Sequence, residues 1–469
     1  MKSLILRVHR SAAAWSFFST MLRVGANIFV LPFILHKLSP DDYAVWIVFG
    51  TIGGLASLLD LGFEQTITRM TSYAWGGATK FRAFGFHEED EKQTPSGPNL
   101  QLLQELIATL KAYYFYVGLA VLTLLAVGGG IWIWFTTRGL DNAESLRLAW
   151  LVYAVGCWLN FVIGRWPALL TGIGAIREAQ VASIISLLAY YVVVMAGLFA
   201  GLGIWSLVVG YVVMGFVARH WGKQLFKRHS RLSSGLPKAH FHPEIFQATW
   251  PNAWRTGLVG VGSFLTIQAN TLICSAFLGL KTTAAYGLSF QLVNILFSLC
   301  NVWLAVKMPA INALRLQNHN EKIANVFACR LRLTLLSYVG GSMVILFAAP
   351  IVLHWLGSKT PLIPFDQMAG LLLIRFLELH QTQYSLLILT ENHNPFLKPS
   401  LITGAATLIM SLVLTPFWGV WGLLISMGVV QLAFTDWWPV FRALKGLNLS
   451  PRVFFIHHYL RPRAWVELF

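Results

Sequence analysis

Residues 57–69 place three charged side chains at the end of a long apolar run that begins near Tyr43. Asp60 and Glu64 are four residues apart, so they share one face of a continuous helix, and Arg69 follows close behind. A charge in the hydrocarbon of a bilayer costs roughly 2.5–3.5 kcal/mol on insertion scales. Such groups therefore usually face a partner, a polar interior or an aqueous cavity, and we interpret this stretch as the wall of an internal pathway.

Four arginines lie inside other apolar runs, and they are Arg23, Arg165, Arg255 and Arg375. Guanidinium groups stay charged and bind phosphate oxygens through paired hydrogen bonds. Several of them around one cavity would form an anion site, with phosphate or diphosphate as the natural ligand. Snorkelling to the interface is the alternative for each, and Arg375 could instead pair with Glu378 in the same helix.

Two roles are open for the carboxylates as well. Asp60 and Glu64 could bind a coupling proton or sodium ion, or they could balance nearby arginines such as Arg23 and Arg69. We expect the first role, which makes Asp60, Glu64 and Arg69 the candidates for coupling or gating. The arginines of the preceding paragraph are then the candidates for binding an anionic cargo.

The composition of the chain defines its class. Only 12% of its 469 residues are charged and 56% are apolar, whereas soluble domains carry about 25% charged residues. Apolar runs of membrane-spanning length recur along the chain, so we predict an all-α polytopic membrane protein with about 12 spans. The predicted spans are 11–36, 43–69, 112–135, 147–171, 178–200, 203–221, 248–278, 284–308, 325–356, 367–390, 397–415 and 418–441.

The connections between these spans divide by charge. Most Lys and Arg residues outside the spans lie in the N-terminus, the 70–111 connection, the 219–247 linker and the C-terminal tail. The opposite connections hold only Lys37, Arg138, Arg147, Lys281 and Lys359. By the positive-inside rule both termini are cytoplasmic. The net charge of +16 is therefore mostly a topology signal, and we expect contacts with membrane lipids and none with nucleic acid.

The basic linker divides the spans into equal halves. We predict an N-terminal six-helix lobe (1–221), a cytoplasmic linker (222–247), a C-terminal six-helix lobe (248–442) and a cytoplasmic tail (443–469). Asn27 and Tyr43 recur as Asn270 and Tyr286 at an offset of 243 residues, which indicates an internal repeat. Both halves start on the same side of the membrane, so the repeat is parallel.

Enzymatic and metal-binding motifs are missing from the sequence. It has no Walker phosphate loop, no GxSxG elbow and no HExxH pair. The four cysteines lie in or beside apolar runs without a CxxC pair, which is typical of small buried hydrophobic residues. We expect neither an enzyme nor a cofactor beyond a coupling ion. The 76–105 segment is the only long polar insertion, and we predict a solvated loop followed by an amphipathic surface helix at 99–110.

The first two predicted spans carry a family pattern. Residues 31–46 contain a proline in the first span and a short turn that ends in Tyr43 and Ala44, and residues 60–62 are Asp-Leu-Gly with Arg69 downstream. This pattern resembles the lipid-linked O-antigen flippases, the polysaccharide transporters of the multidrug/oligosaccharidyl-lipid/polysaccharide exporter superfamily. Ala44 departs from the glycine usual there. The turn at 170–177 is similar too.

The resemblance implies two six-helix lobes around a central cavity that opens alternately to either side of the bacterial inner membrane. It also implies a polyprenyl-diphosphate-linked oligosaccharide as cargo, such as an O-antigen (lipopolysaccharide) or exopolysaccharide repeat unit, with a glycan polymerase and glycosyltransferases as partners. Asp60 has a neutral counterpart, Asn301, in the second half. That difference favours a coupling role for Asp60 in one lobe over a symmetric substrate clamp.

Three other functions stay open at this stage. A cavity dominated by acidic residues would favour a multidrug or cation antiporter of the same superfamily, and the excess of arginines counts against it. A membrane glycosyltransferase would need a large extracytoplasmic loop, which the short connections argue against. A scaffold of a glycan-assembly complex would bind partners without moving lipid.

Overall fold

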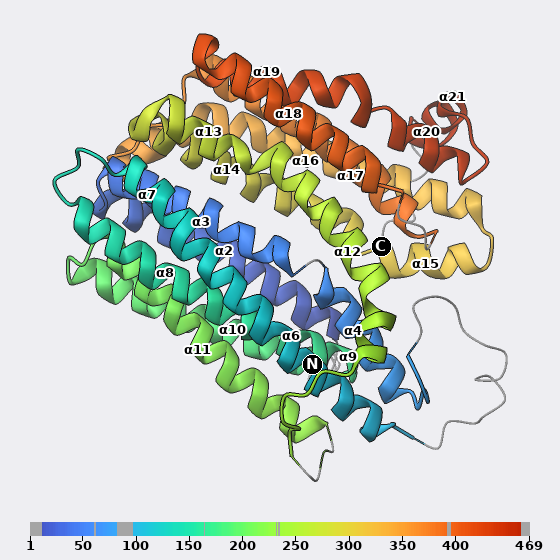
Figure 1. The fold of residues 1–469 in the computed structure, drawn as a ribbon. Helices are drawn as coiled ribbons and strands as arrows, with labels where there is room; N and C mark the ends of the chain where they lie inside the picture. The colour runs from blue at the N-terminus through green and yellow to red at the C-terminus, as the bar shows by residue number, and fades with distance from the viewer. Residues whose placement is uncertain are drawn as a thin grey trace, which may run out of the picture. The chain divides into compact units, whose positions relative to one another are not determined.

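The computed structural model describes residues 12–60, 62–81, 97–163, 165–230, 232, 235–391 and 395–460. These residues form helices and connections with no strand, as the composition predicts (Figure 1). Ten helical segments of this described part are long and apolar enough to cross a membrane. The chain divides into two compact units, Met1–Gly260 and Val261–Phe469. Most of the predicted polar loop lies outside the described residues.

The first unit contains most of the candidate site residues. Its helices, in chain order, are α2 (Ala12–Lys37), α3 (Pro40–Leu59), α4 (Phe63–Trp75), α6 (Leu100–Thr123), the π-helix η1 (Leu124–Gly129), α7 (Gly130–Thr136), α8 (Ala143–Ile163), α9 (Arg165–Gly172), α10 (Ile176–Phe199) and α11 (Ile204–His229). Helix α10 packs against both α2 and α11, α11 packs against α8, and α4 packs against α9. Helix α3 packs against α8, and α6 contacts both α3 and α4, so segments far apart in sequence surround α3 and α4.

The second unit begins within helix α12 (Pro243–Ile267), which crosses the boundary between the units. The elements that follow are α13 (Ala269–Phe277), α14 (Gly279–Ala305), α15 (Met308–Leu316), α16 (Asn320–Trp355), α17 (Phe365–Leu389), α18 (Leu397–Trp418), α19 (Val420–Val430), the π-helix η2 (Gln431–Thr435), α20 (Trp438–Lys445), α21 (Pro451–Val453) and the π-helix η3 (Phe454–Tyr459). Its main contacts join α14 with α16, α18 with α19, and α17 with α20.

The two units repeat the same local features at their last long helix. Gly203 (φ 56°, ψ −132°) precedes α11, and Gly419 (φ 58°, ψ −133°) precedes α19, in a conformation that glycine alone adopts readily. The tryptophan two residues after each glycine makes a similar hydrogen bond: Trp205 Nε1 donates to Ser145 Oγ at the start of α8, and Trp421 Nε1 donates to Asp366 Oδ2 at the start of α17. This agreement is what a parallel internal repeat predicts.

The helix bounds differ from the predicted ranges at the linker and in residues 100–136, among other places. Helix α11 continues to His229 and α12 starts at Pro243, so the connection between them is shorter than the predicted 222–247 linker. Residues 100–110, predicted as a separate surface helix, are the start of a helical segment that runs to Thr136. No proline or glycine stands between Leu102 and Val117, so nothing ends the helix before the membrane-length run.

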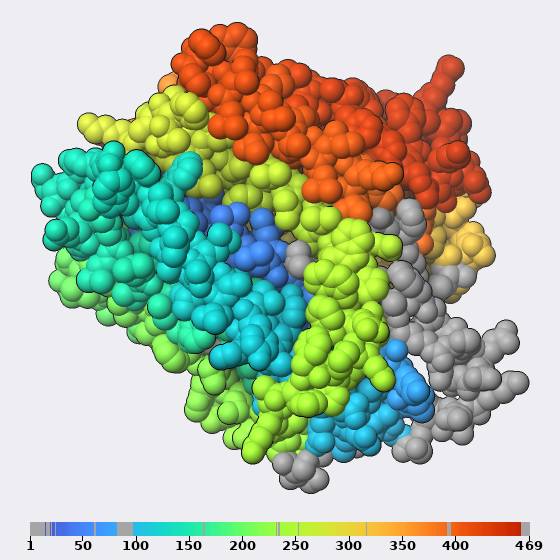
Figure 2. Space-filling model, in the orientation of Figure 1, coloured from blue at the N-terminus to red at the C-terminus, as the bar shows by residue number. Residues whose placement is uncertain are grey.

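Exposed apolar side chains cover the outer faces of several helices. On α6 and α7, the cyan helices on the face seen in Figure 2, they are Phe115, Tyr116, Leu119, Ile131, Trp134 and Phe135. In a membrane-spanning helix such side chains face lipid, because the bilayer is as apolar as they are. The interior contacts are instead made with small residues and aromatic rings.

The π-helix η1 creates one such contact between Trp150 and Gly129. The Leu125 carbonyl in this π-helix accepts a hydrogen bond from Trp150 Nε1 (3.1 Å) as well as one from the backbone N–H of Gly130. A Cβ on Gly129 would lie 2.3 Å from the buried Trp150 ring, whereas the nearest atom to a Cβ on the neighbouring Gly128 is a Leu124 methyl at 3.7 Å. A methyl group therefore fits at Gly128, whereas at Gly129 it would clash with the Trp150 ring.

We expect Gly129→Ala to lower the free energy of unfolding by about 1–3 kcal/mol, because the methyl group displaces the Trp150 ring. Gly128→Ala is the matched control, and its methyl group meets only ordinary contacts while alanine favours the helix. Thermal unfolding of both variants in detergent measures the difference. Equal melting temperatures would contradict this account of the contact.

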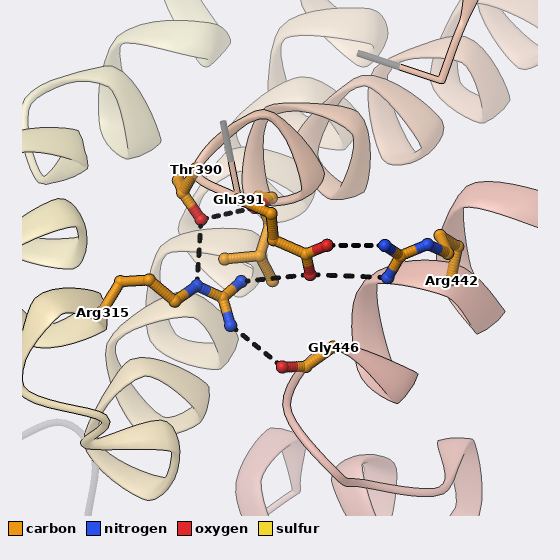
Figure 3. A network of polar contacts seen from close by, with 6 residues as sticks. Arg315, Thr390, Glu391, Arg442 and Gly446 are labelled. Carbon is orange, nitrogen blue, oxygen red and sulfur yellow. Dashed lines mark hydrogen bonds and ion pairs between the residues drawn. The ribbon is translucent and has the colours of Figure 1, made fainter. Parts of the chain in front are cut away.

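A polar network joins three elements of the second unit (Figure 3). Glu391, just after α17, accepts from Arg442 Nη2 of α20 at 2.7 Å and lies 3.6 Å from Arg315 Nη2 of α15. Arg315 also donates to Thr390 Oγ1 (3.2 Å) and to the Gly446 carbonyl (3.0 Å). One carboxylate thus holds two guanidinium groups.

Candidate functional site

The first unit contains a cavity of about 250 Å³ lined by side chains of α3, α4, α6, α8 and α11. Both predicted carboxylates, Asp60 and Glu64, line it. Tyr114, Asn160 and Tyr211 supply the other large polar groups of its wall. The cavity lies among helices of membrane-spanning length, so its polar lining separates it from the apolar core around it.

Asp60 lies at a break between two helices. Helix α3 ends at Leu59, Gly62 has a left-handed conformation (φ 69°), and α4 starts at Phe63. The prediction of a continuous helix through Asp60 and Glu64 is therefore wrong, although both side chains still line one cavity. The cause is visible at Gly62, where a Cβ would lie 2.6 Å from Thr256 of α12 and a non-glycine φ would be strained.

The Asp60 carboxylate forms a hydrogen bond through each oxygen. Oδ2 accepts from the backbone N–H of Glu64 (3.1 Å), and Oδ1 accepts from the hydroxyl of Tyr114 (2.5 Å). The first bond caps the N-terminus of α4, where an acidic side chain also meets the positive end of the helix dipole. Asp60 therefore connects the helix break to a tyrosine 54 residues away in the sequence.

Arg165 lies near the ring of Tyr114, the residue whose hydroxyl bonds Asp60. It begins α9, is 8% exposed, and donates from Nη1 to the Val162 carbonyl (2.6 Å). Its guanidinium carbon is 6.0 Å from the Tyr114 ring centroid and 5.3 Å from that of Trp166. Its Nε has no hydrogen-bond partner among the described residues. One tyrosine thus contacts a buried cation with its ring and a carboxylate with its hydroxyl.

Neither Arg165 nor the remaining predicted residues of the first unit line this cavity. Arg23 is exposed on α2, and Arg255 is exposed on α12 with its guanidinium carbon 5.6 Å from the Trp254 ring centroid. Arg69 is half-buried on α4, and its Nε has no hydrogen-bond partner in the described part of the chain. The structure therefore joins Asp60, Glu64 and Arg165 around Tyr114 and leaves the other arginines outside that group.

Arg375 belongs to the second unit and is only 3% exposed. It forms an ion pair with Glu378 on its own helix and donates from Nη2 to Asn294 Oδ1 (2.6 Å). Its guanidinium carbon lies 4.3 Å from the ring centroid of Phe297. Of the two roles that the sequence left open, the ion pair is the one that this geometry displays.

Asp436 is the residue that the sequence analysis missed. It follows the π-helix η2, is 3% exposed, and neither carboxylate oxygen has a hydrogen-bond partner among the described residues. Gln431 Oε1, one turn earlier, and Gln383 Oε1 on α17 are also buried without a partner in that part of the chain. An ionisable group at membrane depth marks a functional site by default, and its place near the end of an apolar run was the available signal.

A scan against family models and a search of curated proteins both find no match. Solved structures do match. An inward-facing multidrug resistance MATE transporter of the MOP superfamily is similar over 92% of this chain and 96% of its own, with a TM-score of 0.65 and 12% identity. The lipid II flippase MurJ, in an inward closed conformation, is similar over 97% and 91%, with a TM-score of 0.61 and 12% identity.

A MOP superfamily transporter from Pyrococcus furiosus is similar over 95% of this chain and 98% of its own, with a TM-score of 0.57 and 13% identity. Identities this low establish the fold and not the substrate. The predicted fold class is confirmed: the chain is an all-α, multi-pass membrane protein with the fold of the MOP-superfamily transporters.

Proposed function

We propose that the protein is a transporter that moves a polyprenyl-diphosphate-linked oligosaccharide across a membrane by alternating access. The observation that carries this proposal is the group around Tyr114, which joins an acidic cavity to the buried Arg165. A cation site and an anion-binding group are the two parts that a cation-coupled transporter of a diphosphate needs. The resemblance of residues 31–69 to O-antigen flippases supports a lipid-linked cargo, as does the fold shared with a lipid II flippase.

Coupling would act through Asp60. A proton or sodium ion on this carboxylate competes with the hydroxyl of Tyr114 and the N–H of Glu64 for the same oxygens. Loss of either bond weakens the cap at the break between α3 and α4, so the occupied and unoccupied forms favour different arrangements of that break. Tyr114 would transmit the change to Arg165, where the diphosphate would bind through the paired donors of the guanidinium group.

In this role the protein would work in the bacterial inner membrane beside a glycan polymerase and glycosyltransferases, with both termini cytoplasmic. O-antigen and exopolysaccharide repeat units are the cargoes that the sequence resemblance suggests. Arg23, Arg255 and Arg375 stay secondary candidates for the anion, and Arg69 for gating.

A multidrug or cation antiporter is the second candidate. The observation that favours it is the lining of the cavity in the first unit, which has two carboxylates and no arginine. Several structures with the same fold are multidrug transporters, and such a cavity would attract a cationic drug.

Reconstituted vesicles distinguish the two candidates. We expect the purified chain to move a fluorescent polyprenyl-diphosphate disaccharide between leaflets at least about tenfold faster than protein-free vesicles, a difference of roughly 1.4 kcal/mol in the barrier. Accessibility to a membrane-impermeant lectin measures the movement under an imposed proton or sodium gradient. The same vesicles loaded with ethidium provide the comparison: gradient-driven ethidium export without lipid movement would establish the antiporter instead.

A further inference from the structure

A second cavity lies in the second unit and has no part in the site described above. It has a volume of about 410 Å³ and lies between the end of α16, the start of α17 and the connection 356–364. Its wall is mainly apolar and includes Leu346, Pro350, Leu353, Ile363 and Met368. A volume of this size matches the pockets that take small ligands, and an apolar wall selects a hydrocarbon.

The position of this cavity gives it access to lipid. Helix α16 is long and apolar enough to span a membrane and ends at Trp355, which is 81% exposed. Phe365, which lines the cavity, is 60% exposed, and Ile351 beside the lining Pro350 is exposed too. Exposed tryptophan at the end of a span is typical of the membrane interface, so the cavity lies at the level where head groups meet acyl chains.

The polar groups of this cavity suit an anion. His354 lines it and is exposed, and the exposed Lys359 stands between two lining residues, Ser358 and Thr360. No carboxylate is among its lining residues, and Asp366, just after Phe365, accepts a hydrogen bond from Trp421 Nε1 (3.0 Å). Basic side chains beside a hydrocarbon-lined cavity complement an amphiphile with a negative head group.

Thr360 adds a hydrogen-bond donor. Its side chain is 1% exposed, and its hydroxyl has no partner among the described residues. The nearby Ser358 hydroxyl bonds the Thr360 backbone instead: it donates to the carbonyl (2.8 Å) and accepts from the N–H (3.3 Å). A buried hydroxyl without a partner costs about 1–3 kcal/mol, which an ester or phosphate oxygen at this wall would recover.

We propose that this cavity is a binding site for an anionic phospholipid of the surrounding bilayer. One acyl chain fills the apolar cavity, and the phosphate lies beside His354 and Lys359. The occupant is a bilayer lipid and not the transported cargo, so the site is independent of the function proposed above. It would anchor the α16–α17 connection to one leaflet of the membrane.

Native mass spectrometry of the purified full chain tests this site, with phosphatidylglycerol compared against phosphatidylcholine of the same acyl chains. We expect one phosphatidylglycerol to bind about tenfold more tightly than phosphatidylcholine, because basic side chains attract its net negative head group. The double variant His354→Gln/Lys359→Gln should lose this preference. Both substituted side chains are exposed, so the variant should fold as the wild type does.

A second variant tests the apolar part of the site. Met368→Trp should fill the cavity and lower the binding of both lipids, whereas Leu336→Trp, at an exposed position in the middle of α16, should leave it unchanged. If Met368→Trp fails to fold, the double variant decides alone. Equal binding of the two lipids by the wild type would overturn the proposal, and so would an unchanged preference in the double variant.

Discussion

Asp60→Asn should lose at least about tenfold in the rate of lipid transport, an effect of roughly 1.4 kcal/mol on the barrier. Asparagine still caps a helix well, so the break between α3 and α4 and the fold around it should persist. What it cannot do is ionise, so it cannot take up a proton and lacks the negative charge that attracts a sodium ion to the group that holds Tyr114 and the Glu64 N–H. Transport in proteoliposomes, driven by a gradient, measures the loss.

Glu64→Gln is the matched variant for this experiment. Glu64 lines the same cavity but is exposed, so its effect on transport should be smaller than that of Asp60→Asn. The dependence of transport on pH separates the two residues further, because it should disappear in Asp60→Asn and persist in Glu64→Gln. An unchanged pH dependence in both variants would remove the coupling role from this pair.

Arg165→Gln should abolish export of the glycan while the amount of protein in the membrane stays the same. Glutamine cannot supply the charged, paired donors that a diphosphate needs, so the loss should reach about tenfold or more. Arg165→Lys should recover only part of the activity, because its ammonium group keeps the charge without the planar donors. Export in intact cells and lipid movement in vesicles both measure the effect.

A structural role for Arg165 would give a different pattern. The bond from Nη1 to the Val162 carbonyl supports the end of α8, so its loss could lower the melting temperature. The control is Arg138→Gln, which removes a guanidinium group lying 3.9 Å from the Trp134 ring centroid and far in sequence from the site. Arg23→Ala tests the exposed arginine of α2 in the same assay. Wild-type export by both Arg165→Gln and Arg23→Ala would end the anion-site assignment.

The fold could be predicted from the sequence because the bilayer sets the length of a span. Apolar runs of membrane-spanning length and an uneven distribution of Lys and Arg were enough to predict a polytopic helical protein. Gly62, between Asp60 and Glu64, is the one residue in the sequence that indicates a break there, because glycine favours turns over helix. We expected one helix there because apolar periodicity continues through the break.

The partners of the site residues could not be predicted in the same way. Glu378 lies three residues from Arg375, so its ion pair follows from helical spacing. Tyr114 instead reaches Asp60 across 54 residues, and only the packing of α6 against α3 and α4 places it there. Asp436 escaped notice for a related reason, because its burial depends on the neighbouring helices and not on its own apolar run.

The three charged residues of the network around Glu391 should differ in how well they tolerate substitution. Loss of Arg315 or Arg442 leaves one cation and one anion in contact, which is still a neutral pair. Loss of Glu391 leaves two cations close together, and the carbonyl and hydroxyl that bind Arg315 cannot cancel their charge. Related sequences should therefore accept lysine at either arginine position, or the loss of one arginine. The acidic residue should be retained, or lost only together with an arginine.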